Sequence, residues 1–450
     1  MATVRPQSAK MMETLSAALK LPDVRKRLQF VMLMFGVYAI CLYIPLPGID
    51  REALRNWIPS LGGGFMDLLN AFTGGAMKRV SILTLGIMPY INASIIFQLL
   101  TFAVPYFERL QREEGEYGRK KIAQYIRYAT VFLALLQGFG WVMVLRGGGV
   151  VVANTFTIVQ MVITMAAGTA FLMWIGEEIT DKGIGNGVSL VIFCGIMAAF
   201  PTQISRTVQS WKLGAIHGYN IVLLVGLLTC MIMGIIYVQQ AQRRIRVTYS
   251  SRVVGHKMYR GVQTYLPLRV NAAGVIPIIF AISVFMFPAT IVNFMPRDAL
   301  TFLHISPEQM EAAKAWITGF QPGTNTLGVI AAIIYFGLVV LFTYFYTAVT
   351  FRPTEVAEQL MKNGGFIQGI RPGKPTAMYL DRLMTRITLP GSLFLGIIAL
   401  APYYIPIITN VRTFTLVGGT SLLIVVGVAM DTLMQMEAHL LMRNYEGFLK

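Results

Sequence analysis

Uncharged apolar runs recur along the whole chain, and charged or glycine- and proline-rich segments separate them. A helix needs roughly 20 predominantly apolar residues to cross the hydrocarbon core of a bilayer, and most of these runs have about that length. We therefore predict an all-α fold with ten transmembrane helices, of which the fifth is the shortest. They span residues 28–45, 81–104, 128–145, 152–176, 188–203, 219–238, 271–294, 327–350, 387–407 and 415–436.

The composition agrees with a polytopic membrane protein. The mean hydropathy is +0.61, and 55% of the residues are hydrophobic while only 13% are charged, which is far from the profile of a soluble globular chain. If the N-terminus is inside, the predicted cytoplasmic segments carry 28 of the 38 basic residues and the opposite face carries 10. The positive-inside rule then places both termini in the cytoplasm. Met1 opens a polar, basic stretch, so we expect no cleavable signal peptide.

Two predicted cytoplasmic loops, 239–269 and 351–386, are longer and more basic than simple connectors need to be. Alternation in RIRVTY and in the later YLPLRV predicts two strands that flank a turn near Gly255. The second loop has turn signals at Gly364-Gly365 and at 371–375. These charges could serve only to orient the spans. Their concentration on long loops instead favours docking of a polyanionic partner, either nucleic acid or an acidic protein.

Signatures of catalysis and of metal binding are missing. The run GIRPGKPT at 369–376 lacks both the glycine spacing and the Ser or Thr of a phosphate-binding loop. The four histidines have no zinc spacing, and Cys41, Cys194 and Cys230 have neither metal-ligand nor redox spacing. The spans hold essentially no ionisable residue near their midpoints, where ion-coupled transporters usually place one. We expect no catalytic residue, metal or cofactor, and these absences count against an ATPase, a hydrolase and a coupled transporter.

The second and seventh spans share a pattern. INASIIF at 91–97 and VNAAGVIPIIF at 270–280 each combine an Asn-Ala pair with Ile-Ile-Phe, and each span contains a proline. These spans occupy corresponding positions if the chain consists of two halves of five, and interrupted helices at corresponding positions indicate a central pathway. Chance similarity between apolar helices remains the alternative.

Two pairs of aliphatic residues lie four positions apart, Ile87 with Ile91 and Val188 with Ile192. Each pair shares one face of its predicted helix. Such pairs usually reflect ordinary packing. Around a pathway, however, an aliphatic constriction would exclude water and ions by dewetting, and flexible side chains could close around objects of varied shape without binding them.

A glycine-flanked segment, residues 62–79, precedes the second span. Its amphipathic part, 65–72, is too short to cross a bilayer. An interfacial helix and a re-entrant helix are both compatible with it, and composition slightly favours the interfacial one.

Six motifs, in order along nearly the whole chain, resemble those of the bacterial SecY family, the channel subunits of the Sec protein translocase. They are PLPGID (45–50), LGIMPYINASIIFQLL (85–100), GIGNGVSLVIF (183–193), LPLRVNAAGVIPIIFA (266–281), GGFIQGIRPGKPT (364–376) and GTSLLIVVGVAMDT (419–432). The resemblance implies ten helices in two pseudo-symmetric halves, 1–203 and 204–450, around a central pore. It also implies a lateral opening between the second and third spans on one side and the seventh and eighth on the other.

The resemblance further implies roles for individual residues. The pore ring corresponds to Ile87, Ile91, Val188, Ile192, Ile279 and Ile424. The plug corresponds to Phe65, Met66, Asp67, Leu68, Leu69, Asn70, Ala71 and Phe72, which overrules the interfacial interpretation. Polar positions near the lateral gate correspond to Asn92, Gln98 and Asn271. The basic loops would dock partners through Arg243, Arg244, Arg252, Lys257, Arg371 and Lys374.

By the same resemblance, the chain would be a passive channel, not an enzyme, in the bacterial cytoplasmic (inner) membrane. It would pass unfolded preproteins and release apolar segments sideways into lipid. Its partners would be SecE, SecG, the SecA ATPase, the ribosome, signal peptides and membrane lipids. The tip of the first loop, Gly255-His256-Lys257, departs from the Gly-Arg-Arg of many relatives, which weakens the expectation of ribosome contact there because lysine lacks the bidentate phosphate geometry of arginine.

Three classes of function therefore compete. A passive protein-conducting channel agrees with the spans, the loops and the resemblance. A solute transporter or flippase would call for ionisable groups at mid-membrane, and a purely structural scaffold would need neither two interrupted spans nor a plug.

Overall fold

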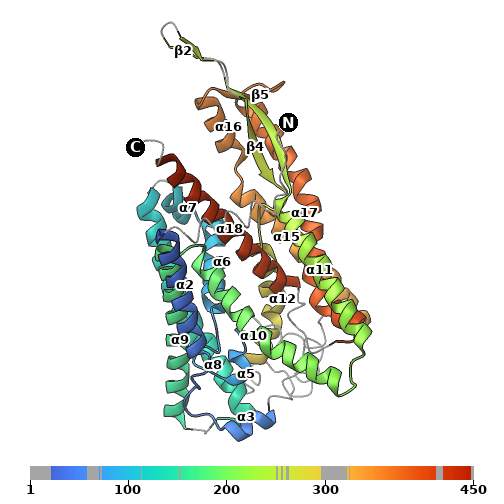
Figure 1. Cartoon of the computed structure of the whole chain (residues 1–450). Helices are drawn as coiled ribbons and strands as arrows, with labels where there is room; N and C mark the ends of the chain where they lie inside the picture. The colour runs from blue at the N-terminus through green and yellow to red at the C-terminus, as the bar shows by residue number, and fades with distance from the viewer. Residues whose placement is uncertain are drawn as a thin grey trace.

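A computed structural model describes residues 22–57, 70, 73–112, 114–151, 154–249, 252–254, 257–259, 263–294, 322–323, 325–411 and 419–446. Ten of its helices overlap the ten predicted spans, one helix to each span (Figure 1). They are α2 (Pro22–Cys41), α6 (Met88–Ala103), α8 (Gly115–Gly147), α9 (Thr155–Lys182), α10 (Gly187–Lys212), α11 (Gly218–Gln240), α12 (Ile276–Phe294), α15 (Thr326–Thr350), α17 (Lys374–Thr409) and α18 (Gly419–Glu446).

Membrane-crossing length differs among these helices. Within the described residues, six are long and apolar enough to cross a bilayer on their own, namely α8, α9, α10, α11, α15 and α17. A seventh span results if α6 is counted together with α7 (Pro105–Arg112), which turns away from it by 99°. The chain is thus a mainly helical, multi-pass membrane protein.

Contacts between helices form two groups. In the first, α8 packs on α6 and α9, and α9 packs on α2 and α10. In the second, α15 packs on α12 and α17, and α18 packs on α11 and α17. The groups meet where α10 contacts α18 and where α8 contacts α12. The expected division at 203/204 falls inside α10, which continues through Pro201 to Lys212.

The two spans expected to be interrupted are helices that begin at their prolines. Residues 81–87 form turns, and Pro89 occupies the first turn of α6, where its missing N–H costs nothing. Pro277 likewise is the second residue of α12. The expectation that span two runs from 81 and span seven from 271 was therefore wrong at the start of each. Proline initiates these helices and does not interrupt them.

The predicted strands of the first basic loop are confirmed as β1 (Gln242–Tyr249) and β4 (Gln263–Arg269), which pair antiparallel from Gln242↔Arg269 to Thr248↔Gln263. A short hairpin of β2 (Arg252–Val254) and β3 (Lys257–Tyr259) lies between them. The second loop contributes β5 (Gly365–Ile367) to the other edge of β1. The two basic loops thus share one sheet of order β4-β1-β5.

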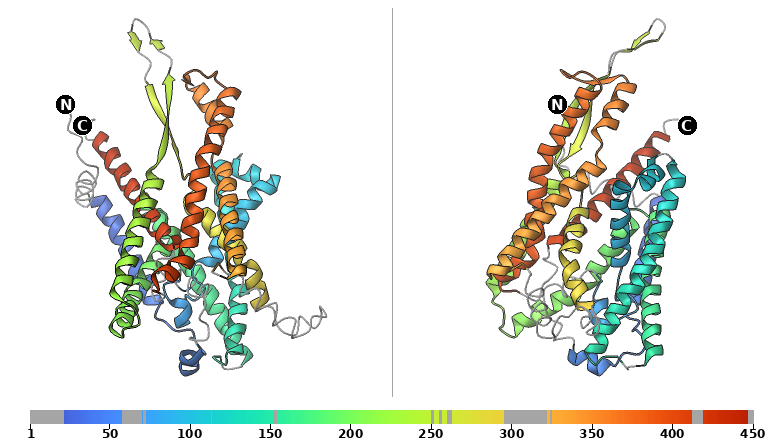
Figure 2. Two further views of the ribbon diagram at one scale, coloured as in Figure 1. Left: turned by 90° about the vertical axis from the view of Figure 1, so that its right-hand side faces the viewer. Right: turned by 180° about the vertical axis from the view of Figure 1, so that it is seen from behind.

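This sheet projects from one end of the helical body, and α18 ends toward the same side (Figure 2). Its buried face carries Ile245, Val247 and Leu268, which pack with Leu380 and Met384 of α17. The short helices α3 (Arg51–Trp57) and α5 (Ala76–Arg79) lie at the opposite end of the molecule (Figure 1). A further helix, α16 (Pro353–Lys362), packs on α17 and precedes β5.

Candidate functional site

Five of the six expected pore-ring residues belong to one large hydrophobic cluster, which also includes residues of α2, α9 and α11. Ile87, Ile192 and Ile424 are buried there, with exposed fractions of 5%, 7% and 3%. Ile91 and Val188 are half-buried and pack against the same cluster. We refer to Ile87, Ile91, Val188, Ile192 and Ile424 as the ring cluster. Its members come from the start of α6, the first turns of α10 and the first turns of α18, which are far apart in sequence.

The start of α6 is held in place by α9. Ile87 lies at the N-cap position of α6, and its carbonyl accepts the N–H of Ile91 at 3.1 Å. The preceding turn is fixed by the buried Thr169, whose hydroxyl donates to the Gly86 carbonyl at 3.3 Å. Ile87 and Ile91 therefore enter the cluster from the start of α6, and the hydrogen bond from Thr169 of α9 fixes the position of that start.

The start of α10 is fixed in a similar way. Asn186 is the N-cap, and its Oδ1 accepts the N–H of Ser189 at 3.1 Å, which satisfies one of the unpaired donors of the first turn. Gly187 lies so close to α9 that a Cβ there would be 1.8 Å from the Gly176 carbonyl oxygen. This approach places Val188 and Ile192 against the cluster.

The sixth expected ring residue, Ile279, is half-buried on α12 and lies outside the ring cluster's hydrophobic core. Val275, just before α12, packs against that core instead. The expected ring, which rested on the family resemblance, did not include Val275. Alignment on Pro89 and Pro277 makes Val275 the counterpart of Ile87, and this signal was available.

The expected gate residues occupy three different environments. Asn92 is half-buried and Gln98 is exposed, both on α6, whereas Asn271 precedes α12 and is 8% exposed. Asn271 donates through Nδ2 to the Gly274 carbonyl at 3.2 Å, and its buried Oδ1 finds no partner among the described residues. Helices α8 and α12 are in contact across the expected gate.

Of the plug, only Asn70 lies within the described residues. Its Oδ1 accepts the Lys78 N–H at 2.9 Å, and its carbonyl accepts the Gly75 N–H at 2.8 Å. The other expected plug residues, Phe65, Met66, Asp67, Leu68, Leu69, Ala71 and Phe72, fall outside that part of the chain.

The expected docking residues lie on the projecting sheet and at the start of α17. Arg243 and Arg244 are exposed on β1, and Arg371 and Lys374 are exposed at the turn into α17. The Arg371 carbonyl accepts the Thr376 hydroxyl at 2.8 Å, which fixes the backbone of that turn. Arg252 and Lys257 belong to the β2–β3 hairpin between the long strands.

Chemistry based on metals or thiols receives no support from the described residues. No group of three or more His, Cys, Asp or Glu side chains is arranged there to hold a metal ion. Cys41 and Cys194 are half-buried and Cys230 is exposed, and all three are free thiols. The described residues instead form a packed aliphatic cluster among the helices and a projecting sheet with exposed basic side chains.

Comparisons with known proteins all identify relatives of one family. The sequence profile of the SecY family matches residues 81–433. The protein translocase subunit SecY of Aquifex aeolicus is 42% identical, with 98% of this chain and 100% of that protein covered. The corresponding subunits of Streptomyces scabiei (98% and 100% covered) and Vibrio cholerae (97% and 96% covered) are 44% and 40% identical.

Solved structures agree on the fold. A protein-conducting channel matches with a TM-score of 0.65 at 17% identity, and the alignment covers 92% of both chains. Sec61 in the canine ribosome–channel complex from the endoplasmic reticulum matches with a TM-score of 0.61 at 16% identity over the same share of each chain.

Proposed function

The chain belongs to the SecY family and is the channel subunit of a protein translocase, and we propose that its ring cluster seals the pore. The observation that carries this proposal is the convergence of Ile87, Ile91, Val188, Ile192 and Ile424 from three separate helix starts into one cluster. No single span provides such a cluster, so the seal requires the fold.

The physical reason for an aliphatic seal follows from what must cross. A hydrophilic chain cannot cross lipid, because each unsatisfied backbone group costs several kcal/mol there. A water-filled route solves this problem but would leak ions. A narrow aliphatic constriction excludes water when it is empty, and it closes around a chain of any sequence because it makes no specific contacts.

Apolar segments would leave the channel sideways. In lipid a leucine-rich segment is favourable, while an Arg or Asp at its centre costs roughly 2.5–3.5 kcal/mol on the insertion scale. We place the opening between α6 and α8 on one side and α12 and α15 on the other, where Asn92, Gln98 and Asn271 would line it. The α8–α12 contact is the packing that would part.

Partners follow from the basic projection. The exposed Arg243, Arg244, Arg371 and Lys374 would dock the SecA ATPase or a translating ribosome, together with Arg252 and Lys257. We further propose SecE and SecG as companion subunits, the bacterial inner membrane as the location, and cytoplasmic termini. The excess of basic residues on the proposed cytoplasmic side supports that orientation.

A cross-linking experiment tests the seal. A variant without Cys41, Cys194 and Cys230 would carry Ile91→Cys, and a stalled secretory precursor with one cysteine would be presented with SecA and ATP. We expect a disulfide whose yield changes as the precursor cysteine is moved along its sequence.

The matched control is Ile163→Cys, which is 56% exposed on the outer surface of α9 and should not cross-link to the same precursor. If Ile91→Cys fails at every precursor position while targeting is intact, the seal is not at the ring cluster.

A further inference from the structure

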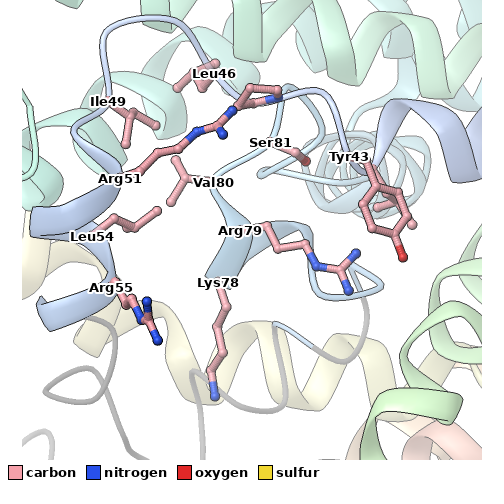
Figure 3. A pocket seen from close by; sticks show the side chains of 12 residues that line it. Tyr43, Leu46, Ile49, Arg51, Leu54, Arg55, Lys78, Arg79, Val80 and Ser81 are labelled. Atoms are coloured by element: carbon pink, nitrogen blue, oxygen red, sulfur yellow. The ribbon is translucent and has the colours of Figure 1, made fainter.

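A pocket of about 540 Å³ (Figure 3) lies beside α3 and α5, at the end of the molecule opposite the sheet (Figure 1). Its volume is within the roughly 300–1,000 Å³ typical of ligand sites. The segment that follows α2, helices α3 and α5, and the residues just after α5 line it. Main-chain hydrogen bonds join its walls: the Leu46 N–H donates to the Val80 carbonyl at 3.0 Å, and the Ile82 N–H donates to the Ile44 carbonyl at 3.1 Å. The pocket is therefore part of the folded framework.

Four basic side chains line this pocket, Arg51, Arg55, Lys78 and Arg79, and among the described residues no carboxylate does. The proposed outer face carries only 10 of the chain's 38 basic residues, and every Lys and Arg of segment 46–80 lines this one pocket. In Figure 3, Arg55 and Lys78 extend toward the same side. Like charges that line one pocket repel one another, so an anion among them would stabilise the arrangement.

The acidic residue next to this pocket, Asp50, is engaged by the backbone of α3. The Asp50 carboxylate accepts the N–H of Glu52 at 2.9 Å and that of Ala53 at 3.3 Å, and so caps α3. Within the described part of the chain, Arg51, Arg55 and Arg79 form no ion pair. Arg79 instead lies over the ring of Tyr43, 4.5 Å from its centroid, which is a cation–π contact that leaves the guanidinium N–H groups available.

Apart from Ser81 and the hydroxyl of Tyr43, the remaining lining is apolar. Leu42, Leu46, Leu54 and Val80 are buried in its walls. Beside it, Ile40 of α2 and Tyr43 and Ile44 of the following segment have exposed fractions of 66%, 70% and 43%. An exposed aliphatic surface with a tyrosine at its end is typical of a membrane–water boundary. The basic pocket thus adjoins a surface that suits acyl chains.

We propose that this pocket binds the phosphate of an anionic phospholipid from the outer leaflet, with its acyl chains against Ile40, Tyr43 and Ile44. The phosphate oxygens accept hydrogen bonds from the basic side chains. These bonds are charge-assisted and therefore stronger than hydrogen bonds between neutral groups. The assignment to the outer leaflet depends on the topology in the proposed function, whereas the proposal that the pocket binds an anionic phospholipid does not. Because Val80 and Ile82 adjoin the turn before α6, the bound lipid stabilises the segment that carries Ile87.

The test uses the full-length chain with its copurifying subunits in nanodiscs of phosphatidylcholine that contain a photoactivatable phosphatidylglycerol. We expect cross-linked peptides from residues 40–57 and 76–82. Each basic side chain near an anionic headgroup strengthens binding by roughly five-fold. The double variant Arg51→Gln and Arg55→Gln should therefore weaken labelling by about thirty-fold in a titration.

The matched control is Arg206→Gln with Lys212→Gln, which removes two exposed basic residues of the same proposed face outside the pocket and should label like the parent chain. Competition with inorganic phosphate or glycerol phosphate at the lipid's concentration should fail. Competition by either would identify a small-anion site and overturn the proposal. Equal labelling of both double variants, or peptides from elsewhere, would also overturn it.

Labelling requires no translocation, so its result is independent of the Ile91→Cys experiment. Should the pocket variant fail to fold, the parent chain still tests the proposal, because the cross-linked peptides are mapped without any substitution.

Discussion

Gly168 marks the closest approach between α9 and the turn that carries Ile87. A Cβ at this position would lie 2.2 Å from the main-chain oxygen of Ile82, whereas ordinary van der Waals contact begins at 3.4 Å. Gly168→Ala therefore requires the two backbones to separate by about 1.2 Å. Neither backbone yields easily, because the Ile82 N–H is bonded to Ile44 and the adjacent Thr169 hydroxyl is bonded to Gly86.

Insertion of a methyl group into such a packed contact costs roughly 1–3 kcal/mol. We expect Gly168→Ala to lower the free energy of unfolding by about that amount, and Gly168→Val to lower it more. Displacement of the turn also moves Ile87 out of the ring cluster. The resting permeability to small ions should then rise, as measured by ion efflux from vesicles that contain the purified complex.

Gly226→Ala is the matched control, since Gly226 is an exposed helical glycine of α11 with nothing within 4 Å of an added Cβ. It should be neutral or stabilising by up to about 1 kcal/mol and should leave permeability unchanged. If Gly168→Ala has the same free energy of unfolding and the same ion permeability as Gly226→Ala, the contact between α9 and the turn does not position Ile87.

Three further predictions concern other parts of the fold. Ile192→Ser should raise resting ion efflux, because a hydroxyl in the ring cluster lets water enter the constriction. Asn186→Ala should destabilise the protein by about 1 kcal/mol in thermal unfolding, because the Ser189 N–H loses its partner. In a chain without native cysteines, Thr248→Cys with Phe366→Cys should form a disulfide under mild oxidation, because these residues are register partners between β1 and β5.

Each of these has its own control. Ile204→Ser changes an exposed position of α10 and should not leak, so equal efflux from both serine variants would contradict the seal. Asn186→Asp keeps the cap acceptor and should retain stability. Thr248→Cys with Gln368→Cys lies two positions out of register and should cross-link far less. Equal yields would show that the two loops do not pair as described.

The ten helices were predictable because lipid imposes length and apolarity on each span, and both can be read locally. The exact starts of α6 and α12 were not predicted, although Pro89 and Pro277 mark them. The shared Asn-Ala pairs lie on opposite sides of those prolines, after Pro89 and before Pro277, so they do not mark the helix starts.

Features that depend on pairing between distant segments could not be predicted from the sequence. β5 is three residues long and exists only because it pairs with Val247–Tyr249, so periodicity carries no trace of it. The basic pocket has the same origin. Arg51 and Arg79 are separated in sequence, and the pairing of Pro45 with Ser81 brings their segments together.

The union of both basic loops in one sheet has a mechanical consequence. The sheet shares its buried core with the first turns of α17, and α17 continues for 36 residues, which at 1.5 Å per residue makes a rod of roughly 54 Å. A partner that tilts the sheet by about five degrees therefore moves the far end of this rod by roughly 5 Å. Pro390, Pro402 and Pro406 are the points at which the rod can bend. Bending at these prolines therefore determines how much of a displacement of the sheet is transmitted to the membrane helices.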